Sequence, residues 1–107
     1  MLEITPNNIE EAIGQSYHSV VVIDFFAPWC GPCKTVGKII DALENEYNGK
    51  VIFCKCNIDA FESLAEQYSI RNVPTISIFK DGKELKRLAG GLPKAKIAEA
   101  LDEILFM

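Results

Sequence analysis

The runs VVVIDFF at residues 20–26 and VIFCKCN at residues 51–57 constrain the fold more than any other feature of the sequence. Both runs are short, apolar and rich in β-branched or aromatic side chains, which is typical of strands that are covered on both faces. The segment between them repeats apolar side chains at helical spacing: Val36, Ile39, Ile40, Leu43 and Tyr47. A strand, a helix and a second buried strand predict a parallel pair joined by a right-handed crossover.

The N-terminal part of the chain adds a strand and a helix to this pattern. Residues 2–4 (LEI) predict a weak first strand. Thr5 is a favourable N-cap residue and Pro6 suits the first helical position, so we expect a helix to begin at Pro6. A shorter helix is indicated by apolar side chains at helical spacing between Phe61 and Tyr68.

The C-terminal part predicts a hairpin followed by a helix. The run TISIFK begins directly after Pro74, and Asp81-Gly82 is a turn signal that joins it to KELKRLAG at residues 83–90. An amphipathic helix then begins at Pro93. We therefore expect an α/β fold with a central mixed five-stranded sheet flanked by four helices, in a single domain that covers residues 1–107.

Composition narrows the classes of function. The hydrophobic fraction of 49% provides a core that does not depend on disulfides. The net charge is −4 and the basic residues are scattered, which argues against a nucleic-acid partner. The acidic, amphipathic start does not resemble a secretory signal, and no apolar run is long enough to cross a bilayer. The expected location is therefore the cytoplasm, where a Cys pair is more often catalytic or metal-binding than structural.

Cys30 and Cys33 fall where the first buried strand gives way to a helix. Free N–H groups at a helix N-terminus stabilise negative charge, so the pKa of the Cys30 thiol should be lowered. Cys33 lies one turn later and should be the less exposed of the two. This asymmetry suits a nucleophile, Cys30, and a resolving thiol, Cys33. Gly31 permits close backbone approach, Pro32 fixes φ early in the helix, and Trp29 offers an apolar surface beside the nucleophile.

Two other interpretations of the cysteines are open. A structural Cys pair is one, although a CxxC motif beside a βαβ pattern favours redox chemistry. The other is a four-thiolate zinc site that adds Cys54 and Cys56. Only one residue separates Cys54 from Cys56, whereas zinc-binding cysteine pairs usually have two or more between them. The two side chains also share one strand face about 7 Å apart, which is long for a disulfide. Their apolar neighbours favour buried core thiols instead.

Taken together, WCGPC at 29–33, Asp24 in the preceding strand, the Val73-Pro74-Thr75 step and Gly90-Gly91 resemble the thioredoxin family along nearly the whole chain. The resemblance implies a thioredoxin fold and a protein-disulfide reductase that carries electrons as a dithiol. It implies no bound cofactor and no metal, only a reversible disulfide between the two motif cysteines. Electrons would come from NADPH through thioredoxin reductase, and the other partners would be disulfide-containing proteins. The protein would act as a monomer, away from membranes and nucleic acid.

Asp24 and Lys55 are the charged residues of the two buried runs. An ionised carboxylate inside such a strand is costly, so the pKa of Asp24 should be raised by desolvation. The alternative without a function is that Asp24 is a strand residue whose side chain reaches solvent at an edge of the sheet. The functional interpretation is a proton acceptor for Cys33, through a water molecule. The resemblance places Lys55 beside Asp24, where its cation would partly offset the raised pKa, whereas a solvent-facing surface lysine is an equal alternative.

Pro74 should occupy the first position of its strand, because it cannot donate to a ladder. The resemblance implies that the Val73–Pro74 bond is cis, that it packs against the Cys pair, and that Val73 offers backbone groups to an extended substrate peptide. A shallow apolar collar around the nucleophile would then consist of Trp29, Gly31, Pro32, Val73 and Gly90.

Two further functions compete with the reductase. The same fold serves as a redox-independent binding module if the cysteines are dispensable. A disulfide-forming oxidant or isomerase is disfavoured by the missing signal peptide and by Gly-Pro between the cysteines.

Overall fold

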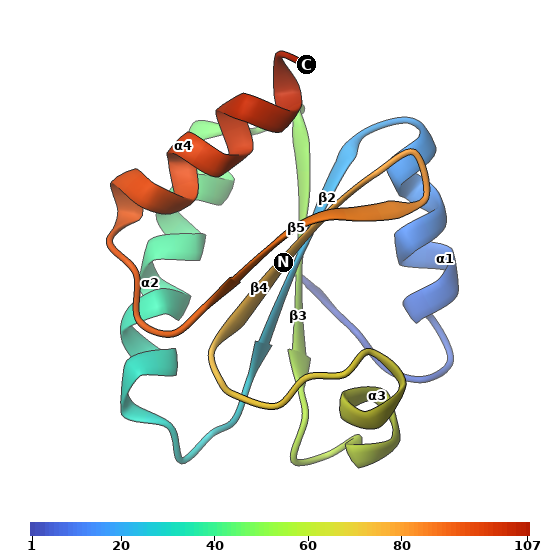
Figure 1. Ribbon diagram of the computed structural model, residues 1–107, viewed down its shortest axis with the longest axis vertical. Helices are drawn as coiled ribbons and strands as arrows, with labels where there is room; N and C mark the ends of the chain where they lie inside the picture. The colour runs from blue at the N-terminus through green and yellow to red at the C-terminus, as the bar shows by residue number, and fades with distance from the viewer.

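A computed structural model describes all residues from 1 to 107 (Figure 1). In chain order the elements are β1 (Leu2–Glu3), α1 (Ile9–Gly14), a short 3-10 helix η1 (Gln15–Tyr17), β2 (Val20–Phe26), α2 (Gly31–Glu46), β3 (Val51–Asn57), α3 (Glu62–Gln67), β4 (Thr75–Lys80), β5 (Lys83–Ala89) and α4 (Lys94–Leu105). None of these helices is both long enough and apolar enough to span a lipid bilayer.

The five strands form one mixed sheet in the order β1-β3-β2-β4-β5. Strands β1, β3 and β2 run parallel, whereas β4 is antiparallel to β2, and β5 is antiparallel to β4. Asp81 and Gly82 connect β4 to β5 with positive φ angles of 54° and 78°, as a tight hairpin turn requires. The predicted α/β class, with a mixed five-stranded sheet and four helices, is confirmed.

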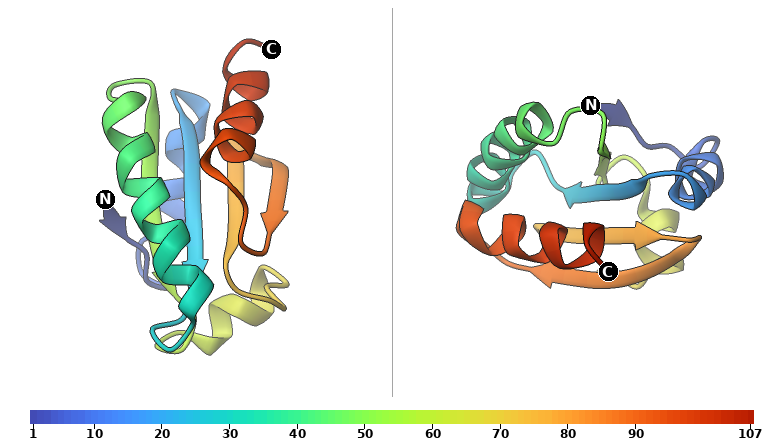
Figure 2. Two further views of the ribbon diagram at one scale, coloured as in Figure 1. Left: turned by 90° about the vertical axis from the view of Figure 1, so that its left-hand side faces the viewer. Right: turned by 90° about the horizontal axis from the view of Figure 1, so that it is seen from above.

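Helices cover both faces of the sheet, as Figure 2 shows: α2 and α4 lie on one side, and α1 and α3 lie on the other. The side chains of successive β2 residues point alternately to the two sides of the sheet. Val20 and Val22 pack against α2 and α4, while Val21 and Ile23 face the helices of the opposite side. This double coverage explains why the strand is apolar at nearly every position.

One end of the sheet gathers the segments that carry the sequence motifs. The register pairs Phe26 with Asn57, Phe25 with Thr75, and Thr75 with Ala89. The end of β2, the start of β4 and the end of β5 therefore meet at the same edge. The loops that continue from them bring the Cys pair, the Val-Pro step and the glycine pair together, although these lie far apart in sequence.

The start of the first helix differs from the prediction. Helix α1 begins at Ile9, three residues after Pro6, and its N-cap is Asn8. The Asn8 side chain accepts a hydrogen bond from the Thr5 N–H at 2.8 Å, and the Thr5 hydroxyl accepts one from the Asn7 N–H at 3.1 Å. These side chains close a local turn before the helix, which is the usual competition between short polar side chains and regular structure.

Candidate active site

Cys30 is the residue that joins β2 to α2. Its backbone is extended, with φ −85° and ψ 114°, and it forms the N-cap of α2. The Cys33 N–H donates a hydrogen bond to the Cys30 Sγ at 3.2 Å. Pro32 lies in the first turn of the helix, where its missing N–H costs no hydrogen bond. The Cys33 N–H in the first turn of α2 therefore points at this sulfur and, with the helix dipole, favours its thiolate form when the pair is reduced.

Cys30 and Cys33 form a disulfide, with their Cα atoms 5.2 Å apart. The two residues are 5% and 4% exposed, so the predicted difference in exposure is absent in this oxidised form. Both cysteines lie in a small cluster with Ala27, against which Phe26 and Val73 pack. Opening the disulfide is what would release Cys30 toward a partner.

The loop before β4 lies against the Cys pair. The Val73–Pro74 peptide bond is cis. The Val73 carbonyl oxygen lies 3.8 Å from the Cys30 Sγ, and Pro74 is buried. The Asn72 carbonyl accepts a hydrogen bond from the Thr75 hydroxyl at 2.6 Å, which fixes this loop to the start of the strand. A backbone edge thus lies directly beside the Cys30 sulfur.

The remaining collar residues surround the same sulfur. The Trp29 side chain is 70% exposed, and Gly31 and Pro32 are exposed beside it. The Gly90 N–H donates a hydrogen bond to the Pro74 carbonyl at 2.9 Å, and its φ of +87° is a conformation that favours glycine. The structure therefore brings all the predicted collar residues to one surface.

Asp24 is the most perturbed group near the cysteines. Its residue is only 3% exposed, and its Oδ1 atom has no hydrogen-bond partner. Desolvation raises the pKa of this carboxyl to about 7, with a further rise from the charge of Asp41 and an opposing effect from Lys55. The alternative of a strand residue that reaches solvent does not fit this burial.

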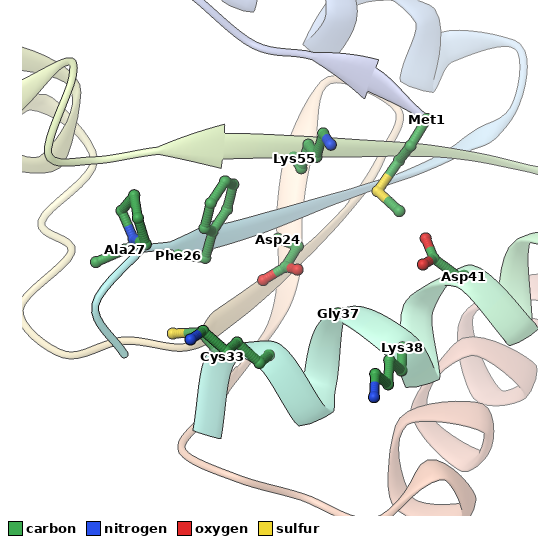
Figure 3. A pocket seen from close by; sticks show the side chains of 11 residues that line it. Met1, Asp24, Phe26, Ala27, Cys33, Gly37, Lys38, Asp41 and Lys55 are labelled. Carbon is green, nitrogen blue, oxygen red and sulfur yellow. The ribbon is translucent and has the colours of Figure 1, made fainter. Parts of the chain in front are cut away.

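A pocket of about 400 Å³ connects Asp24 to Cys33. Its lining includes Asp24, Cys33, Gly37, Asp41 and Lys55. Figure 3 shows the Asp24 carboxylate projecting from β2 toward α2, on the side where Cys33 and Asp41 lie. A volume of this size holds several water molecules, so a proton can pass between the buried carboxyl, the thiol and solvent.

Lys55 lies directly opposite Asp24 in the β2–β3 register and lines the same pocket. Its ammonium group pairs with Glu3, the Nζ and Oε1 atoms being 3.7 Å apart, and its side chain is 39% exposed. The position of this lysine is compatible with both interpretations. It is close enough to oppose the raised pKa of Asp24, and it also reaches solvent.

Cys54 and Cys56 lie on the other side of the sheet. Both thiols are free and fully buried, in the cluster that faces α1 and α3. Burial raises the pKa of each to about 11. They cannot share a ligand set with Cys30 and Cys33, so the four-thiolate zinc site does not fit this fold. No group of three or more His, Cys, Asp or Glu side chains is arranged to hold a metal ion.

Asp41 and Gly37 are pocket residues that the sequence reasoning missed. Gly37 follows Cys33 by four residues and Asp41 follows it by eight, within the predicted helix. That i, i+4, i+8 spacing, which puts all three residues on one helix face, is the signal that would have found them.

Comparison with known proteins agrees with this geometry. The chain matches a protein-family model described as Thioredoxin over residues 1–103. It is 43% identical over 101 residues to a thioredoxin of Chlorobaculum thiosulfatiphilum, a match that spans 94% of this chain and 93% of that protein. A chloroplastic M-type thioredoxin of Spinacia oleracea is 41% identical over 85 residues, which is 79% of this chain and 47% of that protein. Among solved structures, the X-ray structure of Fasciola hepatica thioredoxin superposes with a TM-score of 0.88 at 35% identity, covering 96% of this chain and 98% of that one.

Proposed function

This chain belongs to the thioredoxin family and is a disulfide oxidoreductase that carries electrons on a dithiol, and we propose that it reduces disulfides in other proteins with Cys30 as nucleophile. The observation that carries the proposal is the position of the Cys30 sulfur, which caps α2 and accepts the Cys33 N–H. A sulfur placed there is stabilised as the thiolate, the reactive form.

In the first step the Cys30 thiolate attacks one sulfur of a partner disulfide. A bond forms between the Cys30 sulfur and that partner sulfur, and the partner's own S–S bond breaks. The other partner sulfur leaves as a thiolate and takes a proton from water. The protein and its partner are then joined by a mixed disulfide.

In the second step the Cys33 thiolate attacks the Cys30 sulfur. The bond between the cysteines forms, the mixed disulfide breaks, and the partner leaves fully reduced with two electrons from the dithiol. Cys33 must first lose its proton. Asp24 is the acceptor that we propose, because its raised pKa lies near neutral pH and it shares a pocket with Cys33. The positive charge of Lys55 partly offsets the rise in the pKa of that carboxyl.

The collar binds the partner. Val73 presents its backbone beside the Cys30 sulfur, so an extended partner segment can pair with it as an added strand. Gly31 and Pro32 are exposed and have little side-chain bulk to obstruct a partner that approaches Cys30. Trp29 adds the exposed flat surface of its indole ring. Pro74 and Gly90 fix the backbone that carries this edge.

The remaining features of the proposal concern the cellular context. We assign the protein to the cytoplasm, as a single-domain monomer that is recharged by thioredoxin reductase with electrons from NADPH. Its relatives include proteins named as chloroplastic thioredoxins, so the electron donor is best tested directly. Recycling by purified NADPH-dependent reductase supports the assignment, and recycling by a ferredoxin-dependent reductase alone contradicts it.

Reduction of insulin in the presence of dithiothreitol tests the central function. The wild-type protein should accelerate precipitation of the insulin B chain, and Cys30→Ser should abolish the acceleration. Cys54→Ala is the matched control, because it removes a thiol that lies on the other side of the sheet. A wild-type protein that does not accelerate the precipitation, or a Cys30→Ser variant that keeps all biological activity, would favour a redox-independent binding module instead.

A further inference from the structure

Cys33, Gly37 and Asp41 form one stripe along α2. They are spaced four residues apart, so their side chains lie above one another on the same face of the helix. All three line the pocket into which Asp24 projects (Figure 3). The resolving cysteine and the Asp41 carboxylate are therefore at the two ends of one stripe, and the buried carboxyl faces the space between them.

Gly37 keeps that space open. A Cβ atom added at this position would meet nothing within 4 Å. Asp24 lines this pocket, and its Oδ1 atom is buried without a hydrogen-bond partner. Asp41 is exposed to solvent, so the pocket runs from the buried carboxyl to bulk water along this acidic side chain.

The charges around Asp24 come from several elements, and most of them are engaged elsewhere. Lys55 of β3 pairs with Glu3, and the N-terminal ammonium group pairs with Glu44 at 3.2 Å. The strand on the other side, β4, places Ile76 opposite Asp24.

Helix α2 contributes the remaining charges. Lys34 and Lys38 are exposed, and Figure 3 shows Lys38 directed away from Asp24. Asp41 takes part in no ion pair, although Lys34, Lys38 and Lys55 line the same pocket.

We propose that Asp41 is a positioning residue for the resolving step, whose unpaired carboxylate across the pocket keeps Asp24 able to accept and release the Cys33 proton near neutral pH. The inference rests on the proposed role of Asp24 as proton acceptor. Its electrostatic basis agrees with the direction in which Asp41 shifts the pKa of Asp24, which is upward. Without that charge a larger fraction of Asp24 would be ionised at neutral pH, and its carboxylate would be a weaker base.

The proton balance needs no other reactant. The proton leaves the Cys33 sulfur for the Asp24 carboxylate, directly or through a pocket water, as the Cys33 thiolate forms. Asp24 then releases that proton to the pocket water and on to solvent, past Asp41. One proton enters and one leaves in each turnover, and Asp41 itself is neither consumed nor altered.

The test is a titration of the Asp24 carboxyl carbon by NMR in the oxidised protein. Asp41→Asn should lower the midpoint by about half a pH unit, the size expected from one partly solvated charge. Asp41→Glu keeps the charge and should restore the wild-type midpoint. Glu66→Gln removes one exposed negative charge from α3, on the opposite side of the sheet, and should leave it unchanged.

Salt separates a charge effect from a structural one. In 1 M salt the difference between wild type and Asp41→Asn should shrink, because screening weakens the coupling. An Asp24 midpoint that is the same in wild type and Asp41→Asn would overturn the inference while leaving the reductase function intact. A difference of undiminished size in 1 M salt would also overturn it. Loss of the reductase function would appear separately, in the insulin assay of Cys30→Ser.

The pH dependence of insulin reduction provides the second readout. In Asp41→Asn the acidic limb of the rate profile should move to lower pH by the same amount as the Asp24 midpoint. A profile that coincides with the wild-type profile despite a shifted midpoint would contradict a role for Asp41 in the resolving step.

Discussion

Replacing Asp24 by Asn should stabilise the fold, and the gain should grow as the pH rises from about 4 to about 7. Burial raises the pKa of Asp24 from 3.8 to about 7 in the folded protein. Between these two pH values the native state holds a proton that the unfolded state has lost. The native state therefore loses stability relative to the unfolded state as the pH rises, until Asp24 ionises at about pH 7 and the cost becomes constant.

The size of the effect follows from the shift. A change from 3.8 to about 7 corresponds to about 4 kcal/mol at 1.36 kcal/mol per pH unit. Asn cannot ionise, so the variant escapes this pH-dependent cost. The variant still buries a polar group where the Asp24 Oδ1 atom has no partner. At pH 4 its free energy of unfolding should therefore be equal to that of the wild type or slightly lower.

Urea unfolding followed by far-UV circular dichroism measures the difference. Oxidised wild type and Asp24→Asn would be compared at several pH values from 4 to 9. Asp59→Asn makes the same chemical change at an exposed position and should stay within about 0.5 kcal/mol of wild type. A stability difference for Asp24→Asn that is the same at every pH would refute the raised pKa.

Three further predictions concern other parts of the molecule. Gly37→Ala should stabilise the protein by up to about 1 kcal/mol, because Gly37 lies inside α2 with open space around it; a lower melting temperature would contradict this. Arg87→Ala should destabilise the protein by about 1–2 kcal/mol in urea, since the guanidinium donates to the Tyr68 carbonyl at 2.7 Å at the end of α3; unchanged stability would count against this contact. Cys54 and Cys56 should resist iodoacetamide in the folded, reduced protein and react only on unfolding, because both are buried and each thiol has a pKa of about 11. Mass spectrometry of the labelled native protein measures this, and rapid labelling at either residue would contradict their burial.

Much of the fold was predictable because the decisive signals are local. The apolar runs of β2 and β3, the stripe of α2 and the Asp81-Gly82 turn each follow from short-range patterns. The start of α1 was not predictable in this way. Thr5 and Pro6 are good helix-start residues, but a hydrogen bond from the Thr5 N–H to the Asn8 side chain closes a turn before the helix begins.

The candidate site was predictable in its residues but not in its surroundings. The sequence identifies Cys30, Cys33 and Asp24, and the strand register explains how distant loops converge on them. The role of Asp41 depends on which groups share one pocket and which charges are already paired, and no local pattern encodes that. The similar burial of Cys30 and Cys33, 5% and 4% exposed, likewise differs from what the helix position alone predicted.

Covalent trapping of a disulfide peptide tests the central claim, that Cys30 attacks and Cys33 resolves. Reduced Cys33→Ser would be mixed with a peptide that contains one disulfide, and the adduct would be located by mass spectrometry after proteolysis. The account predicts a stable mixed disulfide on Cys30, none in Cys30→Ser, and only transient adduct in wild type. A stable adduct on Cys33 in the Cys30→Ser protein, or no adduct on Cys30 in Cys33→Ser, would contradict it.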